Sequence, residues 1–194
     1  MTDLDKAKKA IEKGGAVIFP TETAYGIAAD ATKRDAVEKV YEMKQRPRSK
    51  GLTAIVYSME QAEKYSNLSE DEKRTVEDFM PGPLTLVAEK KDNIPDNLNS
   101  DFAFRISSSE TARELTENTP ITATSANISG KETSYSVEDI SEELRQKADY
   151  IIDVGELEDG PTSTIAEVNN SELVIHRKGP VKRSEIEKVL QNDT

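Results

Sequence analysis

Apolar and polar positions alternate in blocks along most of the chain. Residues 16–19 are wholly apolar, which is typical of a strand buried on both faces. Residues 34–44 place their apolar side chains at helical spacing within a charged segment. Residues 102–107 alternate strictly, so Arg105 is expected on the face opposite the two phenylalanines. Such alternation of strands and helices predicts a mixed α/β sheet with helices packed against it.

The same patterns place the remaining elements. A Thr2 cap begins a helix that ends before Gly14, and Ser69 with Glu72 forms a second capping box. No repeat and no domain boundary is visible, so residues 1–194 are expected to form a single domain. Further helices are expected at residues 59–65, 69–80, 109–117, 136–147 and 184–190, and further strands at 52–57, 84–89, 121–125, 150–154, 163–168 and 173–177.

Composition excludes several kinds of site. The 194 residues carry a formal net charge of -11, and the chain has no cysteine and one histidine, His176. Thiolate chemistry, disulfides and multi-histidine metal sites are therefore excluded. The charged first residues do not resemble a signal peptide, and no apolar stretch approaches the roughly 20 residues of a membrane span. We expect a cytoplasmic protein without broad affinity for nucleic acids.

One basic loop stands out in this acidic chain. Lys44, Arg46, Arg48 and Lys50 occupy alternate positions, and Pro47 disfavours a helical backbone at the residue before it. An extended loop would let several of these cations converge on one face and bind phosphates. A solvated basic loop is the alternative that the stretch by itself leaves open.

Familiar nucleotide motifs are missing. The chain contains neither G-x-x-x-x-G-K-[ST] nor G-x-G-x-x-G, so any ATP must be held by side-chain cations and hydroxyls. The polar segment 20–26 directly follows the first strand, and open α/β sheets bind ligands at the carboxyl ends of their strands.

Four polar motifs occur in order along the chain: FPTETAYG at 19–26, KQR at 44–46, PGPLT at 81–85 and TSAN at 124–127. Their order and spacing resemble the short, single-domain form of the YrdC/TsaC family of L-threonylcarbamoyladenylate synthases, and GPTSTI at 160–165 and HRKG at 176–179 extend the match. The resemblance covers roughly residues 5–190 and implies a twisted mixed sheet with flanking helices around a concave, positively charged groove.

This resemblance implies a reaction in which L-threonine, bicarbonate and ATP give threonylcarbamoyl-AMP and pyrophosphate. A downstream tRNA threonylcarbamoyltransferase would then modify adenosine 37 of tRNA, and a weak direct contact with tRNA is compatible with this role. No tightly bound cofactor and no protein metal site are expected, and Mg²⁺ would accompany the substrate ATP.

Site residues follow from the matching positions. Lys44 and Arg46 are the expected catalytic pair, and Arg105 suits the carboxylate of threonine because its planar fork binds a carboxylate bidentately. The expected ATP contacts are Lys44, Arg46, Lys50, Ser125, Asn127, Thr133 and Arg177. The expected L-threonine contacts are Thr23, Arg105, Ala123 and Ser163, with Ile55 a weaker candidate by position.

Other interpretations remain open. A module of the same fold could bind double-stranded RNA or tRNA through phosphates, although the net charge of -11 argues against it. The related domain of hydrogenase maturation factors would bring cysteine-rich zinc fingers, which this chain lacks. The roles of Glu22, Arg48 and His176 are left undecided, and no general base is assigned.

Overall fold

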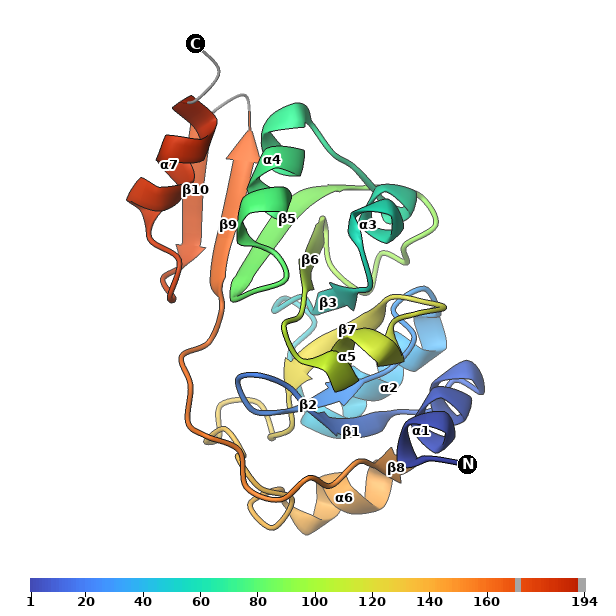
Figure 1. Ribbon diagram of the computed structural model, residues 1–194. Helices are drawn as coiled ribbons and strands as arrows, with labels where there is room; N and C mark the ends of the chain where they lie inside the picture. The colour runs from blue at the N-terminus through green and yellow to red at the C-terminus, as the bar shows by residue number, and fades with distance from the viewer. Residues whose placement is uncertain (170–171, 192–194) are drawn as a thin grey trace.

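The protein has a mixed α/β fold, seen in a computed structural model that describes residues 1–169 and 172–191 (Figure 1). The helices are α1 (Asp3–Glu12), α2 (Arg34–Lys44), α3 (Met59–Tyr65), α4 (Glu70–Phe79), α5 (Glu110–Leu115), α6 (Glu142–Lys147) and α7 (Arg183–Gln191). The strands are β1 (Val17–Pro20), β2 (Tyr25–Ala28), β3 (Thr53–Val56), β4 (Ser66–Asn67), β5 (Leu84–Lys90), β6 (Phe102–Ile106), β7 (Ile121–Ser125), β8 (Tyr150–Ile151), β9 (Thr164–Asn169) and β10 (Glu172–Arg177).

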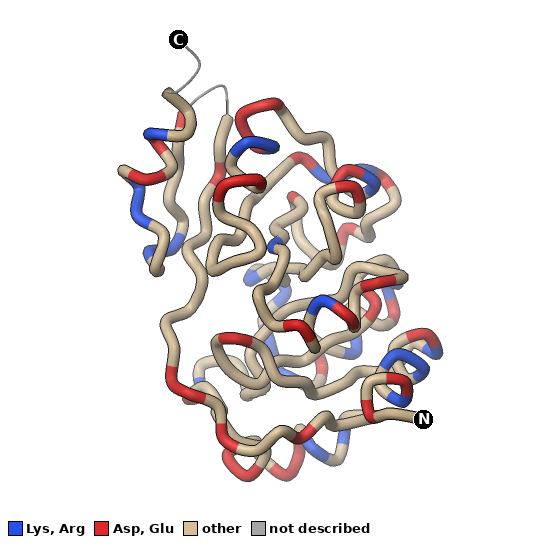
Figure 2. The backbone as a smooth tube through the Cα atoms, viewed as in Figure 1, with Lys and Arg blue, Asp and Glu red and all other residues tan. Residues whose placement is uncertain are grey.

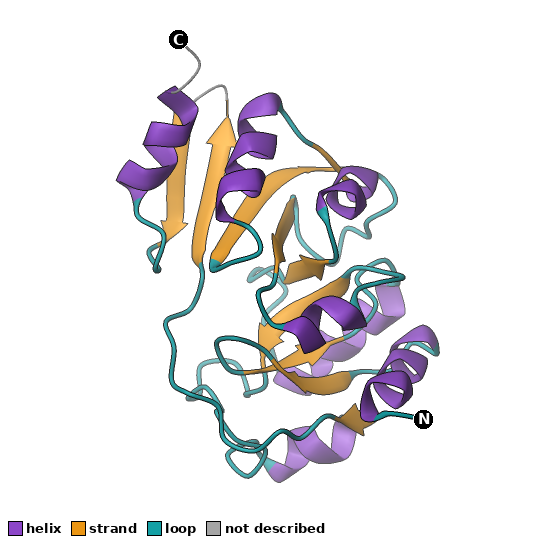
Figure 3. Ribbon diagram, in the orientation of Figure 1, coloured by secondary structure: helices purple, strands orange, loops and turns teal. Residues whose placement is uncertain are grey.

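One sheet runs through the described part of the molecule in the order β10-β9-β5-β6-β3-β7-β2-β1-β8, and β4 pairs with β5 outside this path (Figure 3). The pairs β3–β6, β5–β9 and β1–β8 are parallel, and the other pairs are antiparallel. The expected mixed sheet with flanking helices is thereby confirmed.

Two apolar clusters hold the helices against the sheet. The larger one includes side chains of α2, α4, α6 and α7, and in it the rings of Phe102 and Phe104 stack with centroids 5.4 Å apart. The smaller one joins α1 and α5 to β1, β3 and β7. Removal of these side chains from water supplies the main driving force for folding. Phe104 and Ile106 of β6 belong to the larger cluster, so Arg105 between them points to the opposite face of the sheet, as the alternation predicts.

One expected helix is shorter than predicted, and two strands were missed. Residues 136–141 are not helical, because Ser136 and Asp139 close a turn through two side chain–backbone hydrogen bonds and α6 begins only after Ser141. Strands β2 and β4 were not predicted. β2 has no alternating pattern because all four of its residues are buried, and β4 is two residues long.

The basic loop is also not extended. Gln45 ends α2 in the left-handed region (φ 49), and the amide of Lys50 then donates to the carbonyl oxygen of Pro47 at 2.9 Å, which closes a turn. Of the four alternating cations, Arg46 and Lys50 lie on one surface, whereas Lys44 is buried and Arg48 pairs with Glu38 on α2. Pro47 disfavours a helical backbone at Arg46, but it allows a turn immediately after itself.

Charge is distributed unevenly over this fold. Acidic and basic residues both lie on the outer helices, whereas the segment between β8 and β9, which runs along one side of the molecule, carries acidic residues and no lysine or arginine (Figures 1 and 2). No helix in the described ranges is long and apolar enough to cross a membrane. The cytoplasmic location stays a prediction.

Candidate functional site

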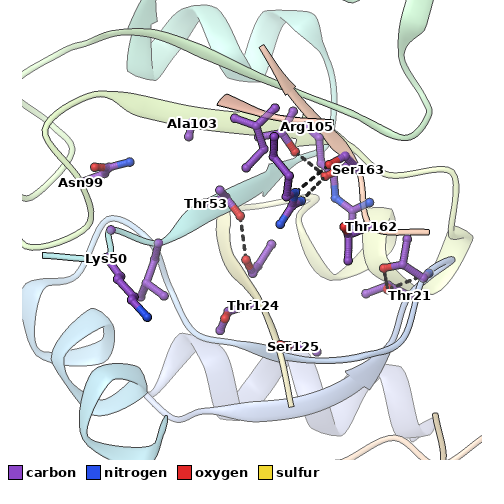
Figure 4. A pocket seen from close by; sticks show the side chains of 18 of the residues that line it. Thr21, Lys50, Thr53, Asn99, Ala103, Arg105, Thr124, Ser125, Thr162 and Ser163 are labelled. Carbon is purple, nitrogen blue, oxygen red and sulfur yellow. Dashed lines mark hydrogen bonds between the residues drawn. The ribbon is translucent and has the colours of Figure 1, made fainter. Parts of the chain in front are cut away.

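A cavity of about 830 Å³ lies where segments far apart in the sequence meet. Its walls come from the β1–β2 loop, the basic loop, β5, β6, β7, the β8–β9 segment and β10 (Figure 4). Four cationic side chains, Arg46, Lys50, Arg105 and Arg177, line it against the two carboxylates of Asp101 and Glu167. Among the described residues the lining is therefore more cationic than the protein as a whole.

Most of the predicted site residues converge on this cavity. It is lined by Arg46, Lys50, Ser125, Thr133 and Arg177 of the expected ATP contacts, and by Thr23, Arg105, Ala123 and Ser163 of the expected threonine contacts. Lys44 and Asn127 lie beside it rather than in its lining. No ligand is present, so the contacts of each residue with substrate stay predictions.

Lys44 is buried, with 1% of its surface exposed, and holds the TSAN segment. Its Nζ donates to the carbonyl oxygens of Ser125 and Asn127, the latter at 2.8 Å, and to Asn127 Oδ1 at 3.2 Å. The main-chain amide of Ser129 donates back to the carbonyl oxygen of Lys44 at 2.9 Å. The ammonium therefore has protein oxygens for all three of its protons, and here it positions the loop rather than facing the cavity.

Ser125 and Asn127 lie together as predicted, with Ser125 Oγ donating to Asn127 Oδ1, but at a turn rather than along an extended strand. The chain turns after β7, and the amide of Asn127 donates to the carbonyl oxygen of Ser125 at 2.9 Å. Ser125 consequently lines the cavity, whereas Asn127 accepts from Lys44 and donates from Nδ2 to the carbonyl oxygen of Lys131 at 2.6 Å.

Arg46 and Arg48 have opposite surroundings. Arg46 donates from Nε to the carbonyl oxygen of Lys50 at 2.6 Å and from Nη2 to that of Gly51 at 2.9 Å, which ties its half-buried guanidinium to the cavity wall. Arg48 instead forms an ion pair with Glu38 on α2 and is not part of the lining. Partial burial lowers the pKa of Arg46, although the guanidinium stays charged.

A second group of contacts lies at the β6 and β10 side of the cavity. Arg177 donates from Nε to the carbonyl oxygen of Ser163 at 2.9 Å and from Nη2 to its hydroxyl at 3.0 Å. That hydroxyl lies 2.9 Å from the hydroxyl of Thr85, in the PGPLT motif. Arg105 forms an ion pair with Glu22 behind it. Figure 4 shows Arg105 and Ser163 close together, with Lys50 on the opposite side.

The two guanidiniums at this side influence each other. Burial lowers the pKa of Arg177, and the positive charge of Arg105 lowers it further. Burial also lowers the pKa of Arg105, which the carboxylate of Glu22 opposes. Glu22 pairs with Arg105, whereas Arg177 has no ion-pair partner among the described residues, so this end of the cavity favours an additional anion.

Ile55, the weaker threonine candidate, and His176, whose role was undecided, differ in their position relative to the cavity. Ile55 is fully buried in the smaller apolar cluster and does not line the cavity. His176 does line it, and its Nε2 lies 2.7 Å from a carboxylate oxygen of Glu167 on the neighbouring strand. This pair lies at the rim, with 44% and 36% of the two side chains exposed.

Sequence reasoning missed several hydroxyl and amide groups of the lining, chiefly Thr21, Thr53, Thr85 and Asn99. Thr21 and Thr85 lie inside the quoted motifs, so the motifs themselves carried the signal for these two. No feature of the sequence indicated Thr53 or Asn99 as site residues, because threonine is common in strands and asparagine is common in polar connectors.

Known proteins share the sequence pattern and the fold of this chain. Residues 9–179 match the family model Sua5_yciO_yrdC, described as telomere recombination. The chain belongs to the Sua5/YciO/YrdC family. A relative from Methanocaldococcus jannaschii, named provisionally as a threonylcarbamoyl-AMP synthase, is 39% identical over 92% of this chain and 86% of its own length.

Pyrococcus abyssi supplies a further named relative and a similar solved structure. Its threonylcarbamoyl-AMP synthase is 37% identical over 93% of this chain and 55% of its own length. A crystal structure of P. abyssi Sua5 complexed with L-threonine superposes with a TM-score of 0.90 and 35% identity, covering 98% of this chain and 58% of the other. In both comparisons the chain spans little more than half the length of the P. abyssi protein.

Proposed function

We propose that this chain is an L-threonylcarbamoyladenylate synthase, a nucleotidyltransferase that makes threonylcarbamoyl-AMP and pyrophosphate from L-threonine, bicarbonate and ATP. The observation that carries the proposal is the convergence of nine predicted contact residues on one cavity. The names of the relatives and the threonine complex of one of them support it.

The dimensions of the site suit these substrates. A volume of about 830 Å³ is near the upper end of the roughly 300–1,000 Å³ of small-molecule sites. The nucleotide would take the side with Arg46, Lys50 and Ser125, and the amino acid the side with Arg105, Ser163 and Thr23. The two substrates would then be adjacent, as the transfer requires.

The reaction needs positioning and positive charge more than covalent chemistry by the protein. The amine of threonine attacks the carbon supplied by bicarbonate, water leaves, and a carbamate forms. A carbamate oxygen then attacks the α-phosphorus while the bond to the pyrophosphate oxygen breaks. Negative charge grows on phosphate oxygens beside an anionic carbamate, so fixed cations would stabilise the transition state.

Each charged group has a role in this scheme. Arg46 and Lys50 would neutralise the phosphates, and Arg105 would hold the threonine carboxylate. Arg177 would bridge the two halves, because it lines the cavity and also fixes the hydroxyl of Ser163. Lys44 would act through the 125–127 segment that it holds. Mg²⁺ would come with ATP, and the downstream tRNA enzyme, tRNA contact and bicarbonate specificity stay predictions.

Pyrophosphate release with purified protein tests the proposal. Release should require ATP, L-threonine and bicarbonate together, and mass spectrometry of the reaction should find threonylcarbamoyl-AMP. Omission of any one substrate is the control. Pyrophosphate release that is independent of threonine, or binding of ATP without this product, would contradict the proposed activity.

A further inference from the structure

Glu22 lies behind the arginine that faces the cavity. One of its carboxylate oxygens accepts a hydrogen bond from Arg105 Nη1 in an ion pair, and the other accepts from Ser107 Oγ. Arg105 lines the cavity, whereas Glu22 and Ser107 do not. The carboxylate therefore contacts the guanidinium from within the wall and leaves the cavity side open.

Ser107 fixes the orientation of this carboxylate. It has no exposed surface, and its Oγ accepts the amide hydrogen of Ser109 at 3.2 Å. Its own proton is therefore available for Glu22. Glu22 thus has two donors at fixed positions on β6 and just beyond it, and bonds to a charged acceptor are the stronger class of hydrogen bond.

Arg105 keeps binding capacity on its other side. A guanidinium has five N–H donors in a rigid fork, and only Nη1 has a protein acceptor among the described residues. Only 9% of this side chain is exposed. A buried guanidinium with unused donors, directed at a cavity, suits the carboxylate of a small ligand.

Glu22 also belongs to the segment that carries the Thr21 and Thr23 hydroxyls. Thr21 Oγ1 accepts from the amides of Thr23 and Ala24, each at 3.2 Å, and lies 3.1 Å from Thr23 Oγ1. Thr21 and Thr23 line the cavity, while Glu22 between them turns to Arg105. The Glu22 carboxylate therefore links the segment that carries the Thr21 and Thr23 hydroxyls to Arg105 on β6.

We propose that Glu22 is a positioning residue of the amino-acid pocket, which holds Arg105 and the Thr21–Thr23 segment in register for the carboxylate of the ligand. This inference rests on the proposed function only in taking L-threonine as the ligand. Glu22 touches no substrate in this scheme and acts through Arg105. The competing arrangement, in which Glu22 occupies the place of the substrate carboxylate and must move away, predicts opposite results.

The test compares Glu22→Ala and Glu22→Gln by calorimetric titration with L-threonine and with L-threoninol, which lacks the carboxylate. Glu22→Ala should weaken threonine binding about tenfold, equivalent to about 1.4 kcal/mol. Glu22→Gln keeps an acceptor for Arg105 and should stay near wild type. Because the effect passes through the carboxylate, the preference for threonine over threoninol should shrink in Glu22→Ala, while the ATP dissociation constant stays unchanged.

Glu117→Ala is the matched control, because it removes a glutamate that pairs with Lys8 on the exposed surface. Equal weakening of both ligands would indicate a merely structural role, and tighter threonine binding by the Glu22 variants would indicate a competing occupant. Either result overturns the proposal. If Glu22→Ala does not fold, Ser107→Ala should give the same loss of preference to a smaller extent, and an unchanged preference there overturns it.

The titrations need no turnover, so the two proposals fail separately. A wild-type protein that binds threonine but makes no threonylcarbamoyl-AMP would contradict the proposed function and leave the role of Glu22 standing. If the wild type forms threonylcarbamoyl-AMP but Glu22→Ala prefers threonine over threoninol as strongly as the wild type does, the role of Glu22 is contradicted and the proposed function stands. The Michaelis constant for threonine measured beside kcat provides the second readout.

Discussion

Lys44 and Asn127 are joined through both the main chain and the side chain of the asparagine, at 2.8 Å and 3.2 Å from Lys44 Nζ. A third bond from the same nitrogen reaches the carbonyl oxygen of Ser125. One buried ammonium thereby fixes a tight turn whose first residue lines the cavity. The KQR and TSAN motifs, about 80 residues apart in the chain, act as one unit in the fold.

Lys44→Met is expected to weaken ATP binding and to lower stability together. The substitution keeps most of the side-chain volume but removes one donor from each of three oxygens. Ser125 O still accepts from the Asn127 amide and Asn127 Oδ1 from Ser125 Oγ, so among the described residues only the carbonyl oxygen of Asn127 is left without a donor, at a cost of about 1–3 kcal/mol. Relief of the desolvated charge offsets part of this cost. We expect a net loss of about 2 kcal/mol, or about 4–8 °C in Tm, measured by thermal unfolding with ATP titration alongside.

Lys188→Met on the exposed side of α7 is the control for that variant, because it removes a lysine that is far from the turn in the sequence and open to solvent. Its Tm and ATP affinity should match the wild type. Unchanged ATP affinity in Lys44→Met, with stability lowered, would show that the turn does not need the ammonium for nucleotide binding.

The pH dependence of stability should carry a contribution from Lys44. Burial, with a smaller effect of Arg46, lowers its pKa from 10.5 to about 7. Because the folded pKa lies below the unfolded one, the unfolded chain binds more protons between pH 7 and 10.5. The stability contribution of Lys44 therefore rises with pH across that window.

Urea unfolding of the wild type and of Lys44→Met at several pH values from 6 to 9.5 measures this contribution as a difference. The difference should move in favour of the wild type as pH rises above 7. ATP affinity should move the other way, because the neutral amine keeps only two donors for three oxygens. A pH-independent difference in both quantities would mean that Lys44 stays charged throughout.

Arg46→Ala should lower kcat/KM by about 100-fold or more, with the fold intact by circular dichroism. The guanidinium both lines the cavity and ties the carbonyl oxygens of Lys50 and Gly51, so its loss removes a phosphate ligand and loosens the loop. Steady-state rates at saturating threonine, with ATP varied, provide the measurement.

Arg48→Ala is the matched control in the same loop, because Arg48 pairs with Glu38 on α2 and does not line the cavity. Its rates should equal those of the wild type. Equal losses in both variants would show that net positive charge of the loop matters rather than the position of Arg46.

The sequence predicted the sheet and most helices, and nine of the eleven predicted site residues line the cavity, because these predictions depend on periodicity and on motifs read locally. Residues 34–44 and 121–125 were predicted with the bounds that the structure has. The direction in which a loop side chain points was not predictable. Arg46 and Arg48 are two residues apart with the same charge, and only the turn after Pro47 separates their directions.

Lys44 and Glu22 illustrate a second limit of prediction from the sequence. A motif identifies residues that the site needs, but it does not say whether they touch the ligand or hold the residues that do. Lys44 was expected on phosphates and lies on Asn127, while Glu22 was left undecided and lies on Arg105. Both distinctions depend on long-range packing, which no local pattern encodes.

Arg105→Ala and Arg177→Ala should separate the two halves of the cavity. Arg105→Ala should raise the Michaelis constant for threonine about tenfold or more and leave ATP binding nearly unchanged, because a carboxylate loses its bidentate partner. Arg177→Ala should raise the Michaelis constants for both substrates. It removes a cavity cation and also frees the hydroxyl of Ser163, which it holds at 3.0 Å.

The comparison includes its own control, since both substitutions delete an arginine from the same side of the cavity. Ser163→Ala adds a third point: it should reproduce the threonine effect of Arg177→Ala without the ATP effect, because only the hydroxyl is lost. An unchanged threonine constant in Arg105→Ala would rule out the carboxylate role. A selective ATP effect in Arg177→Ala would show that its bonds to Ser163 do not matter for threonine.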